Sequence, residues 1–486
     1  MSALTHLLLA AVMLALSCPG MAQSTGVADV ADAGPTRDTL PADVRSALQR
    51  AQIPAQTLSV VVIDAVSGER VLAQQAGRSM NPASLMKLLT TAAALDRLGP
   101  AWRWNTPVWL NGSVQGGVLA GDLHIQGVGD PGLSQERLWL LLRRVQQLGV
   151  REIRGDIVLD QRAFAVPEFD PAAFDGEPLR PYNVGPAALM LNLRSQTYTF
   201  VPIPAAGVAR VLAEPPLAGL QIDRTVPLAS GPCNDWRAAL KASFEPTRTR
   251  FGGSYSSACG ELSWPVADAE PATFDARLMR GLWQESGGVL TGKVRNGAPP
   301  AGAPPSFEFS SPPLLDVVRD VNKFSNNLMS QQLFLTLALQ AAPASPATME
   351  SARETMRQWL QTRFGALALD AVVDNGSGLS RDNRVSAELL AQLLLQSYDS
   401  PVMSELMSSL PISGVDGTLR RSRATPGRAH MKTGSLRDVS GIAGYVLSNS
   451  GRRYVVVAVV NHTQTAGARP ALDALVQWTM RDAPLR

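Results

Sequence analysis

The chain has 486 residues, carries a formal net charge of +3 at pH 7, and is 45% hydrophobic and 17% charged. This length exceeds what one compact core usually accommodates, so two or three domains are expected. The composition is that of a folded globular protein and excludes a disordered one. The small net charge gives no concentrated basic face, so no nucleic-acid partner is expected.

The first residues have the pattern of an export signal. An apolar run at residues 7–16 is followed by small residues, and cleavage is expected near Ala22. The run is too short to span a bilayer, and no later segment is long and apolar enough to do so. We therefore expect residues 1–22 to be a signal peptide and the mature protein to be periplasmic, without a transmembrane segment. Lipidation at Cys18 is the alternative.

Two cysteines, Cys233 and Cys259, remain once the signal is removed. An even pair in an exported protein favours a disulfide over a metal site. The alternative is two buried free thiols. Because the chain has only four histidines, we expect no metal site.

The predicted secondary structure changes along the chain. Residues 58–64 and 70–73 read as a hairpin, and a helical pattern starts at Ser84 and ends at Gly99. Short strands rich in Gly and Pro turns then dominate to about residue 264, with one helix at 135–147. A Gly, Ala and Pro stretch at residues 296–305 has the composition of a linker.

Helical patterns resume after the linker, and the chain ends in predicted strands and a final helix. Helices are expected at 314–321, 328–339, 387–396 and 471–480, and strands at 429–434, 441–447 and 453–460. The whole is an α+β arrangement: a mixed domain of helices and antiparallel strands, split in sequence by a strand-rich insertion.

The first chemical motif is Ser84-Leu85-Met86-Lys87, at the start of a predicted helix. Positions i and i+3 share a helix face, so the Lys87 amine can reach the Ser84 hydroxyl. A serine needs such a base to become a nucleophile. The motif alone says little, because this spacing of Ser and Lys also arises by chance.

The second motif is Ser325-Asn326-Asn327, which interrupts a helical pattern and so lies between two helices. Ser325 can relay a proton, and Asn327 can donate to and accept from a substrate amide. The ordinary alternative is a helix cap.

The third motif is Lys432-Thr433-Gly434, on a predicted strand. The Lys432 cation and the Thr433 hydroxyl can bind a carboxylate, and Gly434 lets a substrate backbone approach the strand edge. The alternative is an edge strand with a solvated lysine.

The three motifs together, in this order and on these elements, form the signature of penicillin-recognising serine enzymes. From about residue 58 to its end the chain resembles the class C low-molecular-mass penicillin-binding proteins, the D-alanyl-D-alanine carboxypeptidase/endopeptidases. The long separation between the first two motifs is similar to that family, which carries two extra domains there. Further similar stretches are residues 129–131, 181–184, 322–328, 374–381 and 413–418.

The resemblance implies a fold and its boundaries. A penicillin-recognising domain, with a five-stranded antiparallel sheet flanked by helices, would comprise residues 23–100 and 300–486. Two inserted β-rich domains would comprise residues 101–163 with 265–299, and residues 164–264.

The resemblance also implies roles. Ser84 would attack the carbonyl of the penultimate D-Ala with Lys87 as base, and Ser325 would pass the proton to the leaving amine. The oxyanion hole would be formed by the N–H groups of Ser84 and Ser435. The remaining implied contacts are Asn327 on the peptide amide, Lys432, Thr433 and Gly434 around the terminal carboxylate, and Asp160 on the amine of a diaminopimelate side chain.

The expected function is that of a serine DD-peptidase. It would cleave D-Ala-D-Ala stem-peptide termini and D-Ala-diaminopimelate cross-links of peptidoglycan, would be acylated by β-lactams, and would need no cofactor. The alternatives are a β-lactamase, an esterase of similar fold, and a catalytically silent cell-wall scaffold or antibiotic sensor.

Overall fold

The computed structural model describes residues 39–482. The predicted signal peptide and Cys18 lie outside the described residues. Among the helices that are described, none has both the length and the apolar character needed to cross a membrane.

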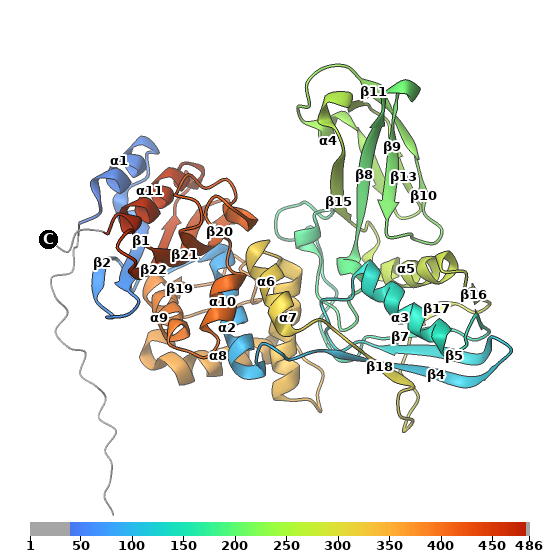
Figure 1. Ribbon diagram of the computed structural model, residues 1–486. Helices are drawn as coiled ribbons and strands as arrows, with labels where there is room; N and C mark the ends of the chain where they lie inside the picture. Colours follow the sequence, from blue (N-terminus) through green and yellow to red (C-terminus); the bar gives the residue numbers. More distant parts are fainter. Residues whose placement is uncertain (1–38, 483–486) are drawn as a thin grey trace, which may run out of the picture. The chain divides into compact units, whose positions relative to one another are not determined.

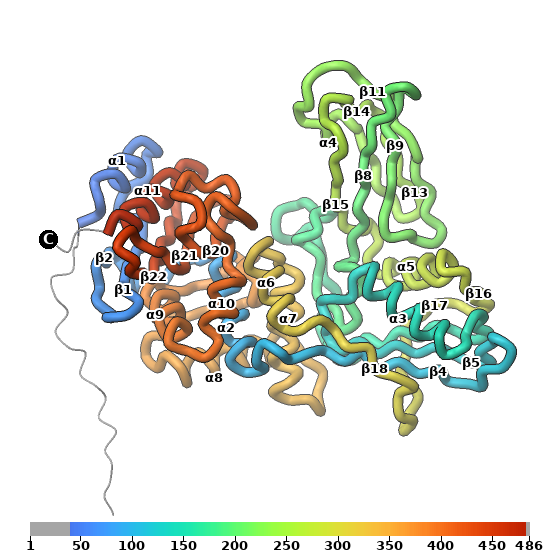
Figure 2. Tube along the Cα trace, in the orientation of Figure 1, coloured from blue at the N-terminus to red at the C-terminus, as the bar shows by residue number. Residues whose placement is uncertain are grey.

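A five-stranded antiparallel sheet joins the two ends of the chain. Its order is β2 (Arg70–Gln74), β1 (Leu58–Asp64), β22 (Arg453–Asn461), β21 (Val439–Leu447) and β20 (Ala429–Leu436). Figure 2 shows the blue and red segments together in this sheet. Side chains alternate across it, so Val60 and Val62 enter one core while Val61 and Ile63 enter another. Burial on both faces explains why β1 is a continuous apolar run.

Helices cover both faces of this sheet (Figure 1). On one side lie α1 (Ala42–Arg50) and α11 (Arg469–Met480). The larger core on the other side is built from α2 (Met86–Leu98), α6 (Leu314–Lys323), α7 (Asn327–Ala341), α8 (Met349–Phe364), α9 (Ala387–Tyr398) and α10 (Met403–Ser409). A short pair of strands, β3 (Ser79–Met80) and β19 (Val385–Ser386), precedes α2 and α9.

A second sheet lies within the insertion. It contains β4 (Asn105–Gln115), β5 (Val118–Gln126), β6 (Glu152–Ile153), β7 (Ile157–Asp160), β16 (Val289–Leu290), β17 (Val294–Asn296) and β18 (Phe307–Ser310). Two helices, α3 (Gln135–Gln147) and α5 (Pro271–Glu285), pack on this sheet through Leu138 and Leu278. This block is therefore mixed rather than β-rich. The helix α5 was not predicted from the sequence, because Gly281 lowers its helix propensity.

The rest of the insertion is a β structure with an aromatic core. One sheet has the order β14 (Tyr255–Ser256), β11 (Thr225–Ala229), β9 (Val208–Glu214), β8 (Ser195–Ile203) and β15 (Leu262–Ala267). The other has β10 (Gln221–Ile222), β13 (Arg248–Phe251) and β12 (Ala242–Glu245), and a short helix α4 (Trp236–Ala239) lies nearby. Phe200 and Tyr255 stack with ring centroids 5.4 Å apart. Cys233 and Cys259 form a disulfide.

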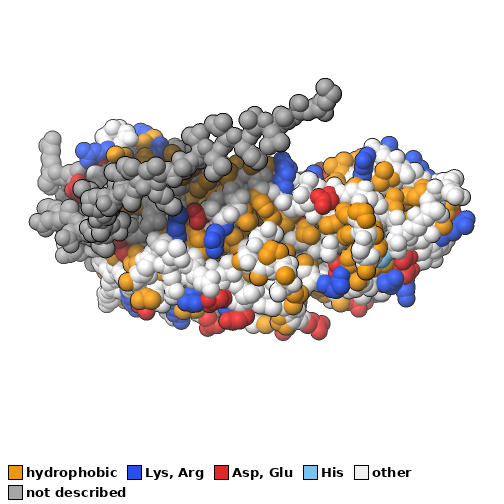
Figure 3. All heavy atoms as spheres, turned by 90° about the horizontal axis from the view of Figure 1, so that it is seen from below, with side chains coloured by type: hydrophobic (Ala, Val, Ile, Leu, Met, Phe, Trp, Pro, Cys, Tyr) orange, Lys and Arg blue, Asp and Glu red, His pale blue; other side chains and the backbone are white. Residues whose placement is uncertain are grey.

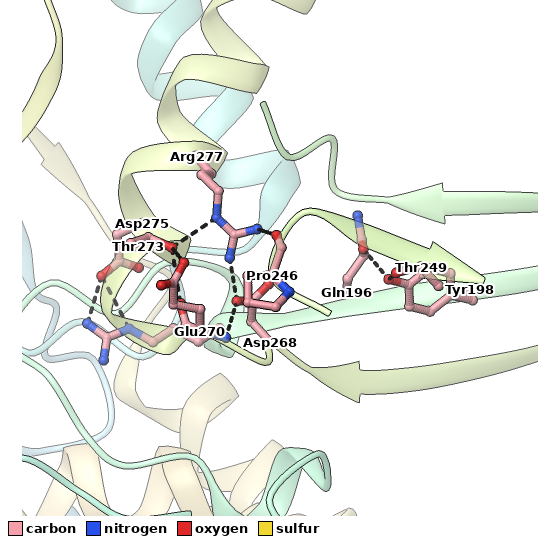
Figure 4. A network of polar contacts seen from close by, with 10 residues as sticks. Gln196, Tyr198, Pro246, Thr249, Asp268, Glu270, Thr273, Asp275 and Arg277 are labelled. Carbon is pink, nitrogen blue, oxygen red and sulfur yellow. Dashed lines mark hydrogen bonds and ion pairs between the residues drawn. The ribbon is translucent and has the colours of Figure 1, made fainter. Parts of the chain in front are cut away.

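Polar contacts tie this β structure to α5. The Arg277 guanidinium on α5 donates to the Pro246 carbonyl at 2.9 Å and to the Thr273 hydroxyl at 3.1 Å, and it also pairs with Asp268 (Figure 4). Because the Arg277 side chain is largely buried, these bonds satisfy a cation that would otherwise be costly to desolvate.

Candidate active site

Ser84 lies in a single 3₁₀ turn, Ala83–Leu85, that leads into α2. Ala83 has a positive φ of 47°, a conformation that costs energy for a residue with a side chain. Two glycines press against this turn. A Cβ on Gly434 would lie 2.6 Å from the Pro82 carbonyl oxygen, and one on Gly378 would overlap the Ala83 carbonyl oxygen. The strand β20 and the loop at residues 374–381 therefore fix the backbone that presents Ser84.

Lys87 is completely buried, and its amine contacts three oxygen atoms. The Nζ atom lies 2.9 Å from Ser84 Oγ, 2.7 Å from Asn327 Oδ1 and 2.5 Å from the Ser377 carbonyl oxygen. Burial, and secondly the charge of Lys432, lower the pKa of Lys87 well below its ordinary value. A neutral amine has two N–H donors and one lone pair. The two carbonyl oxygens match the donors, and the Ser84 hydroxyl matches the lone pair.

Ser325 lies on the connection between α6 and α7, with a positive φ of 58°. The Asn326 side chain caps α7 by accepting from the Met329 N–H at 3.1 Å. At the end of α6, Lys323 pairs with Asp416 at 2.6 Å. These contacts on both sides hold the Ser325 backbone in its strained conformation.

Lys432 lies behind Ser325 and has no exposed surface. Its Nζ donates to Ser325 Oγ at 2.9 Å and to the Thr433 carbonyl at 2.8 Å, and burial lowers the pKa of Lys432 to about 7. Thr433 is also buried, and its hydroxyl donates to the Thr418 hydroxyl at 2.7 Å. The contact of Lys432 and Thr433 with a substrate carboxylate stays a prediction; in this structure both side chains are buried and bonded to protein atoms.

A groove of about 640 Å³ opens beside Ser84. Segments from distant parts of the sequence line it, including the insertion, the second motif, the 374–381 loop and the end of β20. The lining residues are Ser84, Phe174, Asp175, Tyr182, Phe324, Ser325, Asn327, Gly378, Leu379, Arg381, Ser435, Leu436 and Arg437. The groove thus combines a nucleophile, a carboxylate and two guanidinium groups.

Asp175 is the carboxylate that the insertion brings to the groove. It accepts from the Tyr182 hydroxyl at 2.9 Å and from Asn183 Nδ2 at 2.7 Å. Burial would raise the pKa of Asp175, but these bonds outweigh burial and hold the pKa below its ordinary value. Tyr182 also reaches the catalytic motifs, since its carbonyl oxygen accepts from Asn327 Nδ2 at 3.3 Å.

Asp160, the residue predicted to meet a substrate amine, lies elsewhere. It is buried, and its carboxylate accepts from both the Nε and Nη2 atoms of Arg162 and from Gln126 Nε2. A carboxylate already satisfied by a guanidinium and an amide has no free face for a ligand. The substrate contact of Asp160 stays a prediction, and the carboxylate that lines the groove is that of Asp175.

Some residues at or behind the groove were not predicted from the sequence. The buried Ser377 lies behind the groove, and its backbone carbonyl accepts from Lys87. Arg437 follows Lys-Thr-Gly by three positions, and its proximity to that motif was a usable signal. Arg381 packs its guanidinium 5.1 Å from the centroid of the Phe174 ring, which no local pattern reveals.

On the face shown in Figure 3, hydrophobic side chains gather over the middle, and charged side chains of both signs are spread around them. Within residues 39–482 there is no group of three or more His, Cys, Asp or Glu side chains arranged to hold a metal ion.

Comparisons with known proteins agree on one family and one fold. The model of the D-Ala-D-Ala carboxypeptidase 3 (S13) family matches residues 40–482. A D-alanyl-D-alanine carboxypeptidase of Actinomadura sp. (strain R39) is 28% identical, over 91% of this chain and 85% of its own length. The D-alanyl-D-alanine carboxypeptidase DacB of Haemophilus influenzae is 26% identical, over 82% of this chain and 84% of its own. The crystal structure of penicillin binding protein 4 from Haemophilus influenzae has a TM-score of 0.70 at 22% identity, covering 90% of this chain and 99% of that one, which establishes an α+β penicillin-recognising fold.

Proposed function

Because the chain belongs to the D-Ala-D-Ala carboxypeptidase 3 (S13) family, we propose that its carboxypeptidase activity proceeds through an acyl-enzyme on Ser84. The observation that carries the proposal is the environment of Lys87. A buried amine with a lowered pKa lies 2.9 Å from the Ser84 hydroxyl, and two carbonyl oxygens occupy its remaining positions. This arrangement supports a neutral Lys87 as the general base.

The acylation step uses groups that lie around the groove. Ser84 Oγ attacks the carbonyl carbon of the penultimate D-Ala and gives its proton to Lys87. The backbone N–H groups of Ser84 and Ser435 stabilise the oxyanion. Ser325 passes a proton to the leaving D-Ala amine, and Lys432, 2.9 Å behind Ser325, holds the Ser325 hydroxyl in place. Water then hydrolyses the ester, which returns Ser84 to its free state.

The free carboxylate of the substrate needs a receptor that faces the groove. Since Lys432 is buried, Ser435 and Arg437 are the groups near Lys-Thr-Gly that line the groove. An exposed guanidinium can bind a carboxylate in a bidentate manner. We therefore assign the exposed part of the carboxylate contact to Ser435 and Arg437, while Lys432 holds Ser325 from behind.

Cleavage of D-Ala-diaminopimelate cross-links is the second part of the proposal. The cross-link adds a side chain that carries an amine, and Asp175 offers an ionised carboxylate in the groove. The same centre of diaminopimelate that bears the scissile amide also bears a free carboxylate, so Arg437 would serve both substrates.

β-Lactams should acylate the same serine, because a strained lactam mimics the D-Ala-D-Ala amide. One of the structures with this fold is penicillin binding protein 4 of Haemophilus influenzae complexed with a novel β-lactam. Peptidoglycan lies outside the cytoplasm, and the disulfide between Cys233 and Cys259 fits an oxidising compartment. We therefore propose a periplasmic enzyme.

The test is digestion of cross-linked muropeptides by the purified protein, with product analysis for released D-Ala and for opened cross-links. Labelled penicillin, followed by peptide mapping, should mark Ser84. Ser84→Ala should lose both activities, and Lys87→Met should lower acylation by about 100- to 10,000-fold. Ser404→Ala, at an exposed position on α10, is the matched control. Label on another residue, or uptake by Ser84→Ala, would refute the proposal.

A further inference from the structure

Large hydrophobic side chains are exposed on one face of α3. Trp139 is 49% exposed, Leu140 is 44% exposed and Leu148, just past the helix end, is 36% exposed. The opposite face of the helix, with Leu138, Leu141, Leu142 and Val145, is buried against the second sheet and α5. Figure 1 shows α3, in teal, lying over this sheet. The helix is thus apolar on both faces in its middle, although only one of them has a partner within the described chain.

A neighbouring strand extends this surface. Val289 on β16 is 54% exposed, and its N–H donates to the Arg151 carbonyl at 2.9 Å, which places it close to the segment that follows α3. Four of the twelve large hydrophobic side chains that are exposed among residues 39–482 therefore lie here. Single exposed apolar residues are ordinary, whereas a cluster that includes a tryptophan marks an interaction site.

Arginines lie among these apolar side chains. Arg143 follows Trp139 by four positions, and Arg144 lies four positions from both Leu140 and Leu148, so each arginine neighbours an apolar side chain on the solvent side of the helix. Arg143, Arg144 and Arg151 are exposed, and within residues 39–482 none of them is within ion-pairing distance of a carboxylate. The nearby Arg154, by contrast, pairs with Glu152 at 3.1 Å.

We propose that this surface, which we call the α3 face and define as Trp139, Leu140, Arg143, Arg144, Leu148, Arg151 and Val289, docks the protein on a membrane surface that contains anionic phospholipids. The indole of Trp139 suits the region between headgroups and acyl chains. The leucines enter the apolar boundary, while the arginine stems lie along it and their guanidinium groups reach the phosphates.

The charge of the α3 face favours an anionic lipid surface. Arg143 and Arg144 lie between Trp139 and Leu148 and have no carboxylate partner among residues 39–482, so burying them in a protein interface would require a partner that supplies matching carboxylates. At a lipid surface the same groups stay largely hydrated and contact phosphate. The α3 face shares no residue with the Ser84 groove, so the inference stands independently of the proposed chemistry.

The experiment is flotation of the mature protein with two sets of vesicles, phosphatidylcholine alone and phosphatidylcholine mixed with phosphatidylglycerol. Binding is expected only to the anionic vesicles and should weaken with salt. The double variant Arg143→Glu/Arg144→Glu should bind at least about tenfold more weakly, because each basic residue near such a surface contributes roughly fivefold. Trp139→Ala/Leu140→Ala should also bind more weakly.

Two control variants separate this surface from general exposure. Arg420→Glu/Arg421→Glu and Leu369→Ala change exposed side chains elsewhere and should leave vesicle binding unchanged. All variants should keep wild-type penicillin labelling, which shows that they are folded. Equal binding to neutral vesicles, no binding to either set, or unchanged binding of the α3-face variants would overturn the proposal. A dimer in light scattering that disappears in Trp139→Ala/Leu140→Ala would also overturn it, in favour of a second copy of this chain.

Discussion

Replacing Gly378 with alanine would add a methyl carbon that overlaps the Ala83 carbonyl oxygen and lies 2.9 Å from the Ser84 nitrogen. Gly378 also has a φ of +84°, which costs a residue with a side chain about 1–2 kcal/mol. Relief of the overlap requires the 374–381 loop or the Ser84 turn to move, at about 1–3 kcal/mol. We therefore expect Gly378→Ala to lower the free energy of unfolding by about 2–5 kcal/mol.

The same substitution should impair catalysis, because the adjacent Ser377 carbonyl holds Lys87 at 2.5 Å. A displacement of about 1 Å at this point should slow penicillin acylation about 100-fold. Gly427→Ala is the matched control: its φ is +76° and nothing lies within 4 Å of the added methyl group. It should lose about 1–2 kcal/mol and acylate normally. Urea unfolding and acylation kinetics measure both effects, and wild-type stability and acylation in Gly378→Ala would refute the reasoning.

Three further predictions follow from charged groups of the site. Burial lowers the pKa of Lys432 from 10.5 to about 7, so the unfolded chain binds an extra proton between these values and stability should rise with pH from about 7 upwards. Urea unfolding at pH 7 and pH 9 measures this effect: the free energy of unfolding should rise less in Lys432→Met than in wild type. An equal rise in both proteins would contradict the lowered pKa of the buried amine. Asp175→Asn should slow cross-link cleavage while leaving penicillin labelling intact; equal losses in both assays would place Asp175 in the acylation step instead. Arg437→Gln should lower kcat/KM on peptides ending in D-Ala-D-Ala acid by about 30- to 150-fold, with little change on the corresponding amide. A similar loss on both peptides would remove Arg437 from the carboxylate contact.

The sequence predicted the elements whose ends carry the motifs, because these ends have local signals. The apolar run of β1 and the break at Ser325 depend on neighbouring residues, and the structure has both of them. The helix predicted from Ser84 is also present, but Ser84 lies in a 3₁₀ turn and α2 begins at Met86. The structure also brings Lys87 to Asn327 and Lys432 to Ser325 across large sequence separations. This juxtaposition was predictable once the three motifs were taken as a set.

The rest depended on tertiary contacts that no local pattern encodes. A strand pattern does not tell that the Lys432 amine is buried and donates to Ser325. Asp160 ends a strand, as a binding residue can, but Arg162 occupies its carboxylate. Asp175 lies on an irregular segment, and its place in the groove depends on Tyr182 and Asn183.

The insertion begins and ends at one point of the chain's path. Asn105 on β4 pairs with Ser310 on β18, and just outside this pair the Ser311 N–H donates to the Trp104 carbonyl at 2.8 Å. The strands β4 and β18 therefore pair antiparallel where the insertion leaves and rejoins the rest of the chain. A short turn could connect them in place of the insertion without a topological obstacle. Such an excised enzyme would keep Ser84, Lys87, Ser325 and Lys432, yet it would lose Phe174, Asp175 and Tyr182 from the groove. Under the proposed roles, this excision would separate the Ser84 chemistry from the Asp175 contact, and it would also remove the Gly129 and Ala187 carbonyls that accept from the buried Gln332 side chain.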